Sequence, residues 1–432
     1  MALRTLPAEK VKLSNKATLL VEESHSLPIV SLCAYFKGGI RAENDSNNGI
    51  TYFLQKMLPK GTQQYTAEEM AFKTEALGGS FSFFTEKDNF GCTISVLSKH
   101  FDEALSLLME TLFHPTFPVD EVEKERESVL ADINESRDEI YSHSLLLCDR
   151  ALFATHPYRL PLKGSPECVN TVQQSDLAAW HQKWVVPNNL IFSIVGDVAA
   201  ERMIEHASRA IETLPKGKLP KLSDLGAPAK GIREIEQERD KRQVAVALGF
   251  IGPPAESDDR FTFEVMNGLL TGMGSRLFIE LRDKKGLAYS IGSRYDPSLD
   301  YGILKTFMGT SIEHEQAAKE GLFEELMRLR GVTPSEEELE KTKRHLIGLY
   351  EISRQKSYVR AMRYARYEML GLGWRTANLY PKKIQAVEAA AVRKVAEHYL
   401  TPENYACAIV GPSRKRFDAT ATNRPALLKQ ML

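Results

Sequence analysis

The chain has no excess of charge of either sign, which removes the usual electrostatic argument for a nucleic-acid partner. Its 432 residues include 56 lysines and arginines against 57 acidic residues. Binding to phosphate backbones or anionic membrane surfaces normally requires a clear positive excess. We therefore expect neither nucleic acid nor a membrane among the partners.

Long apolar runs and paired cysteines are also missing. No window approaches the ~18 consecutive apolar residues that a membrane-spanning helix needs, and the opening MALRTLPAEKVKLSNK has no apolar core of signal-peptide length. Few cysteines are present, and no Cys-x-x-Cys pair occurs among them. Scattered thiols of this kind indicate reduced, buried side chains and a cytoplasmic location. The cysteines are Cys33, Cys92, Cys148, Cys168 and Cys407.

An internal repeat is present instead. Residues 177–198 align without a gap to residues 392–413, at a spacing of 215, with matching Pro-x-Asn and Val-Gly pairs. EVEKER at 121–126 matches ELEKTK at 338–343 in the same order. Two matches at nearly the same offset favour a duplicated chain.

The length and the repeat together predict two homologous domains. We place an N-terminal peptidase-like domain at 1–214, a linker rich in Pro, Gly and Lys at 215–231, and a homologous C-terminal domain at 232–432. In each half, strands with hairpin turns precede long helical segments. That order predicts the α+β class, with a mainly antiparallel sheet and helices packed on one face.

The stretch NGITYFLQKMLPKGT, residues 48–62, predicts a short helix with Tyr52, Gln55 and Lys56 on one face. With Met57 and the following Lys-Gly-Thr, it resembles the zinc helix of the insulinase and mitochondrial processing peptidase family, the inverted zincins. The family signature is His-x-x-Glu-His, in which two histidines bind zinc and the glutamate serves as general base. Here tyrosine and lysine replace the histidines and glutamine replaces the glutamate.

The resemblance also identifies the position of the third ligand, a glutamate that lies seven residues after another glutamate. These positions are Asp132 and Glu125, so the ligand position departs from the family while Glu125 fits it. A lysine ammonium repels a metal dication, and a glutamine side chain cannot accept a proton. We expect no zinc on this chain. The sequence leaves two alternatives for Lys56: an ion pair with Asp132 in place of the metal, or a side chain that points into solvent.

A second departure lies at Gly78–Thr85, which resembles the family's substrate-binding strand. Ser82 replaces an asparagine and Phe83 replaces an alanine, and both are possible peptide contacts. Phe83 either closes the peptide cleft or packs in an ordinary core.

The first half departs from the family at the zinc motif, whereas the second half keeps a pair of residues typical of the family. Residues 269–295 resemble the stretch in the family's C-terminal halves that carries an Arg/Tyr pair, here Arg282 and Tyr289. In two-chain bacterial members, one chain holds zinc and the other supplies this pair. An arginine can bind a carbonyl or carboxylate, and a tyrosine can donate to an oxyanion. Gly272 and Gly274 form either a flap with peptide contacts or a turn between helices.

The resemblance therefore implies a non-catalytic subunit of a zinc metallopeptidase heterodimer, with no catalytic residues and no cofactor of its own. Its partners are a zinc-bearing paralogous subunit and a peptide substrate, and Arg282 and Tyr289 serve the partner's site. The alternative is an inert peptide-binding or scaffolding homodimer. A third reading, a zinc peptidase with an unusual site, requires metal at Tyr52, Lys56 and Asp132.

Overall fold

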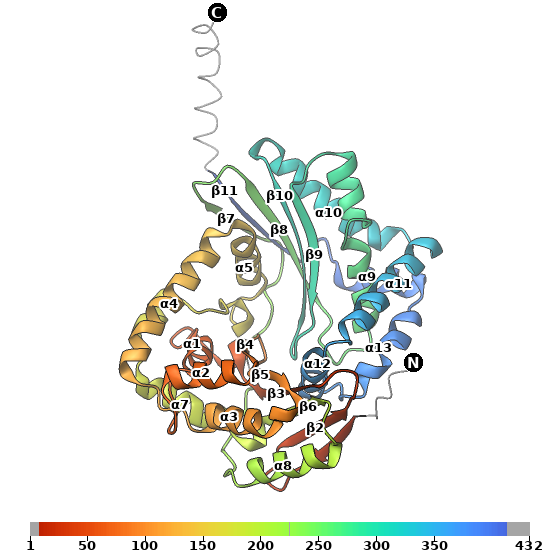
Figure 1. The fold of residues 1–432 in the computed structure, drawn as a ribbon. Helices are drawn as coiled ribbons and strands as arrows, with labels where there is room; N and C mark the ends of the chain where they lie inside the picture. The colour runs from red at the N-terminus through yellow and green to blue at the C-terminus, as the bar shows by residue number, and fades with distance from the viewer. Residues whose placement is uncertain (1–7, 224, 413–432) are drawn as a thin grey trace, which may run out of the picture. The chain divides into compact units, whose positions relative to one another are not determined.

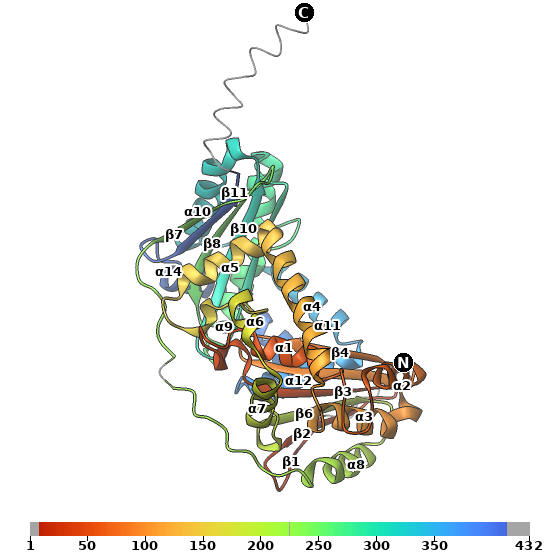
Figure 2. The same cartoon turned by 90° about the vertical axis from the view of Figure 1, so that its left-hand side faces the viewer.

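The computed structural model describes residues 8–223 and 225–412. These residues form two compact units, and each unit contains one sheet (Figures 1 and 2). The two sheets and the many helices confirm the α+β class. Among the described residues, no helix has the length and apolar content needed to cross a membrane.

The first unit contains a six-stranded sheet with the order β1-β2-β6-β3-β5-β4, in which β2 and β6 are parallel and the other pairs antiparallel. Helices α1–α3, α6–α8 and most of α4 belong to this unit. The strands are β1 (Glu9–Lys12), β2 (Thr18–Glu23), β3 (Ile29–Lys37), β4 (Ser80–Thr85), β5 (Asn89–Leu97) and β6 (Leu190–Gly196). The helices are α1 (Ile50–Met57), α2 (Ala67–Ala76), α3 (Phe101–Phe113), α4 (Val119–Asp138), α6 (Pro166–Thr171), α7 (Gln174–Trp184) and α8 (Ala200–Glu212).

The second unit has the same strand order without an equivalent of β1: β7-β11-β8-β10-β9. Again one pair, β7 with β11, is parallel. The shared order supports the duplication that the repeat predicts. The strands are β7 (Arg233–Glu238), β8 (Val244–Gly252), β9 (Ser290–Asp296), β10 (Gly302–Thr310) and β11 (Ala406–Gly411). The helices are α5 (Ile140–Leu152), α9 (Arg260–Leu270), the wide helical segment η5 (Leu277–Lys284), α10 (Glu315–Gly331), α14 (Ala389–Tyr399) and the first part, up to Leu346, of α11 (Glu336–Ser353).

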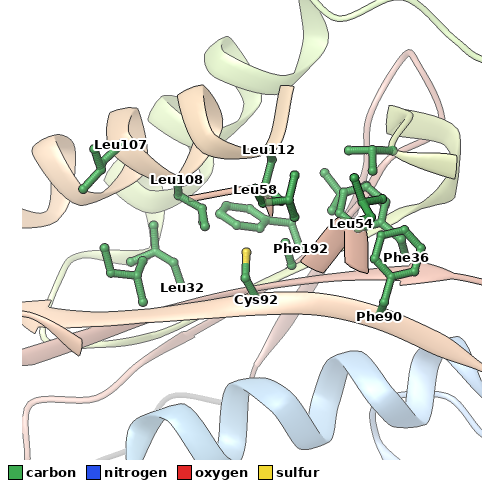
Figure 3. Close-up of a cluster of buried hydrophobic side chains, with 14 of the residues drawn as sticks. Leu32, Phe36, Leu54, Leu58, Phe90, Cys92, Leu107, Leu108, Leu112 and Phe192 are labelled. Carbon is green, nitrogen blue, oxygen red and sulfur yellow. The ribbon is translucent and has the colours of Figure 1, made fainter. Parts of the chain in front are cut away.

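One face of the first sheet holds the main apolar core. Alternate residues of β3, such as Leu32 and Phe36, point toward α1 and α3, because successive side chains of a strand face opposite sides. Figure 3 shows this cluster above the sheet and a pale blue helix, α12 (Ser357–Met369), on the opposite side. The prediction of helices on one face is therefore incomplete, since α12 covers the second face.

The compact units do not follow the two sequence halves. Residues 347–381, from the second half, pack in the first unit, and residues 135–159, from the first half, pack in the second. Figure 1 shows the consequence: yellow α5 lies beside β11 and β8, and blue α12 lies beside β3 and β6. Each sheet thus receives one helix from the other half of the chain. The predicted ranges 1–214 and 232–432, whose outer ends extend beyond the described residues, did not anticipate this exchange.

Candidate functional site: a zinc-helix position filled by an ion pair

Helix α1 forms as the sequence predicts, with an apolar face directed into the core. Ile50, Phe53, Leu54 and Met57 are buried on that face. Tyr52, Gln55 and Lys56 are only half-buried and lie on the remaining surface of the helix. Packing of one face therefore fixes the direction of the three side chains that resemble the zinc motif.

The start of α1 is held by a buried glutamate that the sequence analysis missed. Glu43 Oε2 accepts hydrogen bonds from Asn48 Nδ2 (2.9 Å) and the Gly49 N–H (2.8 Å), and Oε1 accepts from the Thr51 N–H (3.0 Å). Burial of the carboxyl raises the pKa of Glu43, although these hydrogen bonds oppose the shift. Gly49 is required here, because its backbone is left-handed and a Cβ would lie 2.6 Å from the Gly164 Cα.

Lys56 and Asp132 form the ion pair that the sequence predicts as one of two alternatives. Lys56 Nζ lies 2.8 Å from Asp132 Oδ2, and the Tyr52 hydroxyl donates to the same oxygen at 2.8 Å. Burial alone would raise the pKa of Asp132, but hydrogen bonds from Lys56 and Tyr52 lower it overall. The two positions of the histidine motif and the third-ligand position therefore form one hydrogen-bonded cluster.

Two further lysines lie along the same part of α4. Lys163 Nζ donates to the Asp132 carbonyl oxygen at 2.9 Å, and Lys60 Nζ lies 2.6 Å from Glu125 Oε1. Glu125 thus has a cation of its own, from the Lys-Gly-Thr segment. The role of Lys163 was not predicted, because the contact joins residues distant in the chain and no motif contains it.

Gln55, at the general-base position, is bonded to strand β4. Its Oε1 accepts from the Thr85 hydroxyl at 2.7 Å, and its Nε2 donates to the Phe83 carbonyl oxygen at 3.4 Å. The amide therefore connects α1 to the edge strand of the sheet. An amide in this position has no proton-accepting role of the kind that a glutamate provides.

Strand β4 is a sheet edge. The tight turn bond from the Glu86 N–H to the Asn89 carbonyl (2.7 Å) sets the ladder alternation, so the backbone groups of Phe81, Phe83 and Thr85 point away from β5. Ser82 is exposed, whereas Phe83 is half-buried, packs against the main core and stacks on Phe81 with ring centroids 4.6 Å apart. Phe83 therefore packs against the core from a half-buried position, and its contact with a peptide stays a prediction.

Arg282 and Tyr289 lie on the surface of the second unit, at the end of η5 and just before β9. The Tyr289 side chain is 60% exposed, and its backbone N–H donates to the Gly309 carbonyl (2.8 Å). The Arg282 guanidinium lies over the Phe278 ring, 4.7 Å from its centroid. Within residues 8–223 and 225–412, neither side chain has a hydrogen bond or an ion pair.

The glycine segment after α9 forms a tight turn. The Ser275 N–H donates to the Gly272 carbonyl at 3.0 Å, and Lys341 Nζ donates to the Gly274 carbonyl at 3.0 Å. Gly272 has a positive φ of 100°, and Met273 between the two glycines is 80% exposed. The turn reading is confirmed for the backbone, and peptide contact by Gly272 and Gly274 stays a prediction.

The residues at the zinc positions do not fit the metal. A neutral tyrosine is a poor ligand, and the Lys56 ammonium is a cation that already holds the one carboxylate present. Across the described part of the chain, no group of three or more His, Cys, Asp or Glu side chains has the arrangement for a metal ion.

The two sheets of equivalent strand order and the altered zinc helix are features of a homologue of the insulinase-type peptidases. Two family models agree. Residues 18–165 match the model described as Insulinase (Peptidase family M16), and residues 171–346 match Peptidase M16 inactive domain. The chain belongs to this family, peptidase family M16.

Relatives and solved structures extend the likeness over nearly the whole chain. The uncharacterized zinc protease YmxG of Bacillus subtilis is 28% identical over 404 residues, which cover 92% of this chain and 97% of the relative. An uncharacterized zinc protease of Rickettsia bellii is 26% identical, over 80% of this chain and 83% of its own. The fold matches a Pseudomonas fluorescens peptidase M16 inactive domain with a TM-score of 0.87, at 22% identity, over 94% of this chain and 98% of the other. A protease from Helicobacter pylori gives a TM-score of 0.87, at 22% identity, over 94% and 99%.

Proposed function

We propose that this chain is the non-catalytic subunit of a zinc metallopeptidase heterodimer. A zinc-bearing paralogous subunit performs the hydrolysis, and this chain shapes the peptide chamber and supplies Arg282 and Tyr289 to the partner's site. The observation that carries the proposal is the Lys56–Asp132 ion pair of 2.8 Å at the positions that resemble zinc ligands.

The chemistry of the cluster supports the loss of hydrolysis on this chain. An approaching dication meets the Lys56 ammonium, and even at an effective dielectric of 20 two like unit charges ~4 Å apart repel by roughly 4 kcal/mol for each unit of charge. Gln55 supplies no base, and its amide is already bonded to Thr85. The general-base position therefore offers no proton acceptor to a water molecule, and the Lys56 ammonium disfavours a Lewis acid beside it.

The exposure of Arg282 and Tyr289 supports a role in a partner's site. An arginine with no acidic partner on its own surface retains all its donors for a substrate carbonyl or carboxylate. A 60% exposed phenol in the same segment can donate to a developing oxyanion. Both residues are exposed on the surface of the second unit.

The test is a cleavage assay with this chain co-expressed with a paralogue that carries intact His-x-x-Glu-His. We expect Arg282→Ala and Tyr289→Phe each to lower kcat by about 10²–10³-fold, the typical loss of one oxyanion donor. Lys284→Ala is the matched control, since that exposed lysine is paired with Glu280 at 2.8 Å and should leave turnover unchanged. Unaltered turnover in both site variants excludes the assigned contribution.

The outward backbone groups of β4 favour a second candidate, an inert peptide-binding homodimer. A sheet edge with outward-pointing donors and acceptors can add an extended peptide as a further strand, and Gln55, which donates to the Phe83 carbonyl at 3.4 Å, would have to release that group. Size-exclusion chromatography with and without the paralogue separates the two candidates. A shift to a mixed dimer supports the heterodimer, and a stable homodimer that ignores the paralogue supports the alternative.

A further inference from the structure

The two exchanged helices, α5 and α12, occupy equivalent places in the two units but carry different polar side chains. Helix α5 packs on β8 and β11, and α12 packs on β3 and β6. They begin at residues 140 and 357, so His143 and Arg360 are both the fourth residue of their helices. Asp149 and Arg366 are likewise equivalent, as the tenth residue of each.

At the first of these positions, each helix meets a matching group on its sheet. Arg360 Nε lies 2.9 Å from Glu22 Oε1 on β2, with both side chains less than 10% exposed, and the Tyr364 hydroxyl donates to Glu22 Oε2. In the second unit, His143 Nε2 lies 2.7 Å from Gln237 Oε1 on β7. Glu22 pairs in register with Val195 and Gln237 with Val410, the residues before the glycines that end β6 and β11, so the two partners are equivalent. One sheet offers an anion to a cation, and the other offers an amide to an imidazole.

At the second position, the charges on the two helices are opposite. Asp149 binds the buried Lys305 of β10 through both carboxylate oxygens, at 2.9 and 2.8 Å. Arg366 in α12 lies 3.3 Å from Glu86 instead. Lys305 in β10 pairs in register with Gly249 in the adjacent strand β8.

The shapes of the two sheet surfaces also differ at this point. Gly249 leaves room for α5, because a Cβ there would lie 2.4 Å from Cys148 Sγ. Val30 and Val244 are equivalent, because each contacts the glycine that ends the neighbouring strand. The residue that follows each valine by the same distance along the strand is therefore also equivalent, and in the first sheet it is the buried Tyr35. Tyr35 fills the space that Cys148 needs.

We propose that these contacts act together as a recognition device that assigns each exchanged helix to the sheet of the other half. On the first sheet, α5 would present Asp149 near Glu86 and Cys148 to Tyr35. On the second sheet, α12 would bring Arg366 toward Lys305 and leave Arg360 without an anion. A buried charge that lacks its partner is strongly destabilising, so each helix is stable on one sheet only.

The experiment exchanges the partners at the first position in the full chain. The variants are His143→Arg alone and with Gln237→Glu, which give the second unit the polar pair of the first. Docking is read from thiol labelling, because Cys148 is buried between α5 and the second sheet. Cys33 is the matched probe under α12, since it is fully buried and shares a face of β3 with Ser31, whose Oγ lies 2.8 Å from Ser357 Oγ.

We expect His143→Arg to lower Tm by roughly 5–10 °C, as an unpaired buried cation does, and to speed the labelling of Cys148 but not of Cys33. Adding Gln237→Glu should reverse more than half of the Tm loss and more than half of the increase in Cys148 labelling, although the arginine at position 143 is still present. The proposal is wrong if Cys148 is labelled as slowly in His143→Arg as in the wild type. It is equally wrong if the double variant is no better than the single one, or fails to fold while His143→Gln folds.

Discussion

Replacing Lys56 with methionine removes the cation of the cluster that fills the zinc-helix position, while it preserves most of the side-chain volume. Asp132 would then keep the Tyr52 hydroxyl as a donor but lose the ammonium 2.8 Å from its Oδ2. Asp132→Asn removes the charge from the other side and leaves an oxygen for Tyr52. The double variant completes a cycle that isolates the interaction between the two charges.

The exposure of the pair sets the expected magnitude. The Lys56 and Asp132 side chains are 29% and 26% exposed, so the pair lies between a surface and a buried ion pair. A charge-assisted hydrogen bond contributes about 1.5–3 kcal/mol, and fully exposed pairs contribute roughly 0.2–1 kcal/mol. We expect a coupling free energy of about 1.5 kcal/mol, which corresponds to a Tm change of roughly 3–6 °C for a unit of this size.

Urea unfolding at pH 7 and again at a pH of about 2.5, below the unfolded carboxyl pKa of ~3.9, measures the cycle. Because the folded pKa of Asp132 is lowered, its stabilisation is present above the unfolded pKa of ~3.9 and is lost as the pH falls through the folded pKa. Lys56→Met should therefore reduce the acid sensitivity of unfolding. A coupling below about 0.3 kcal/mol at pH 7, which is the usual error of additivity, would refute the assignment of the pair as a metal substitute that stabilises the helix position.

Three further predictions test separate contacts. Glu43→Gln should destabilise the protein by about 2 kcal/mol in urea unfolding, because one carboxylate acceptor at the start of α1 becomes an amide donor; an unchanged midpoint would contradict this cap. Burial, the largest cause, lowers the pKa of His143, so wild-type stability should fall as the pH drops from the unfolded value of ~6.5 toward the folded one, and thermal unfolding of His143→Gln should lack that slope. Gly249→Ala should cost about 1–3 kcal/mol through overpacking against Cys148, and Cys148→Ala in the same chain should recover most of the loss, as chemical denaturation can show.

Local patterns were sufficient for the elements and for the altered zinc motif. The apolar spacing in residues 48–62 predicts α1 and the shared face of Tyr52 and Lys56, and the nearly continuous apolar run in residues 29–37 predicts β3. The link from Lys56 to Asp132 was predictable only through the family resemblance, since it joins helices distant in the chain.

The remaining contacts depend on tertiary structure that no local pattern contains. Glu43 precedes α1 by a polar loop and reads as a surface residue in the sequence, yet it is buried because three donors converge on it. The transfer of α5 and α12 between units depends on which apolar sheet face each helix covers. Both helices have the same period, so their sequences alone do not indicate the sheet.

The exchange of helices has a consequence for synthesis of the chain on the ribosome. The first sheet is complete in sequence once β6 ends at Gly196, but the face that carries Ser31, Cys33 and Tyr35 waits for residues 357–369 to emerge. A nascent chain that stops near residue 225 holds an uncovered apolar sheet surface and the unpaired Glu22. The N-terminal unit therefore finishes folding only when most of the C-terminal half has been translated, and chaperone binding should be strongest in that interval.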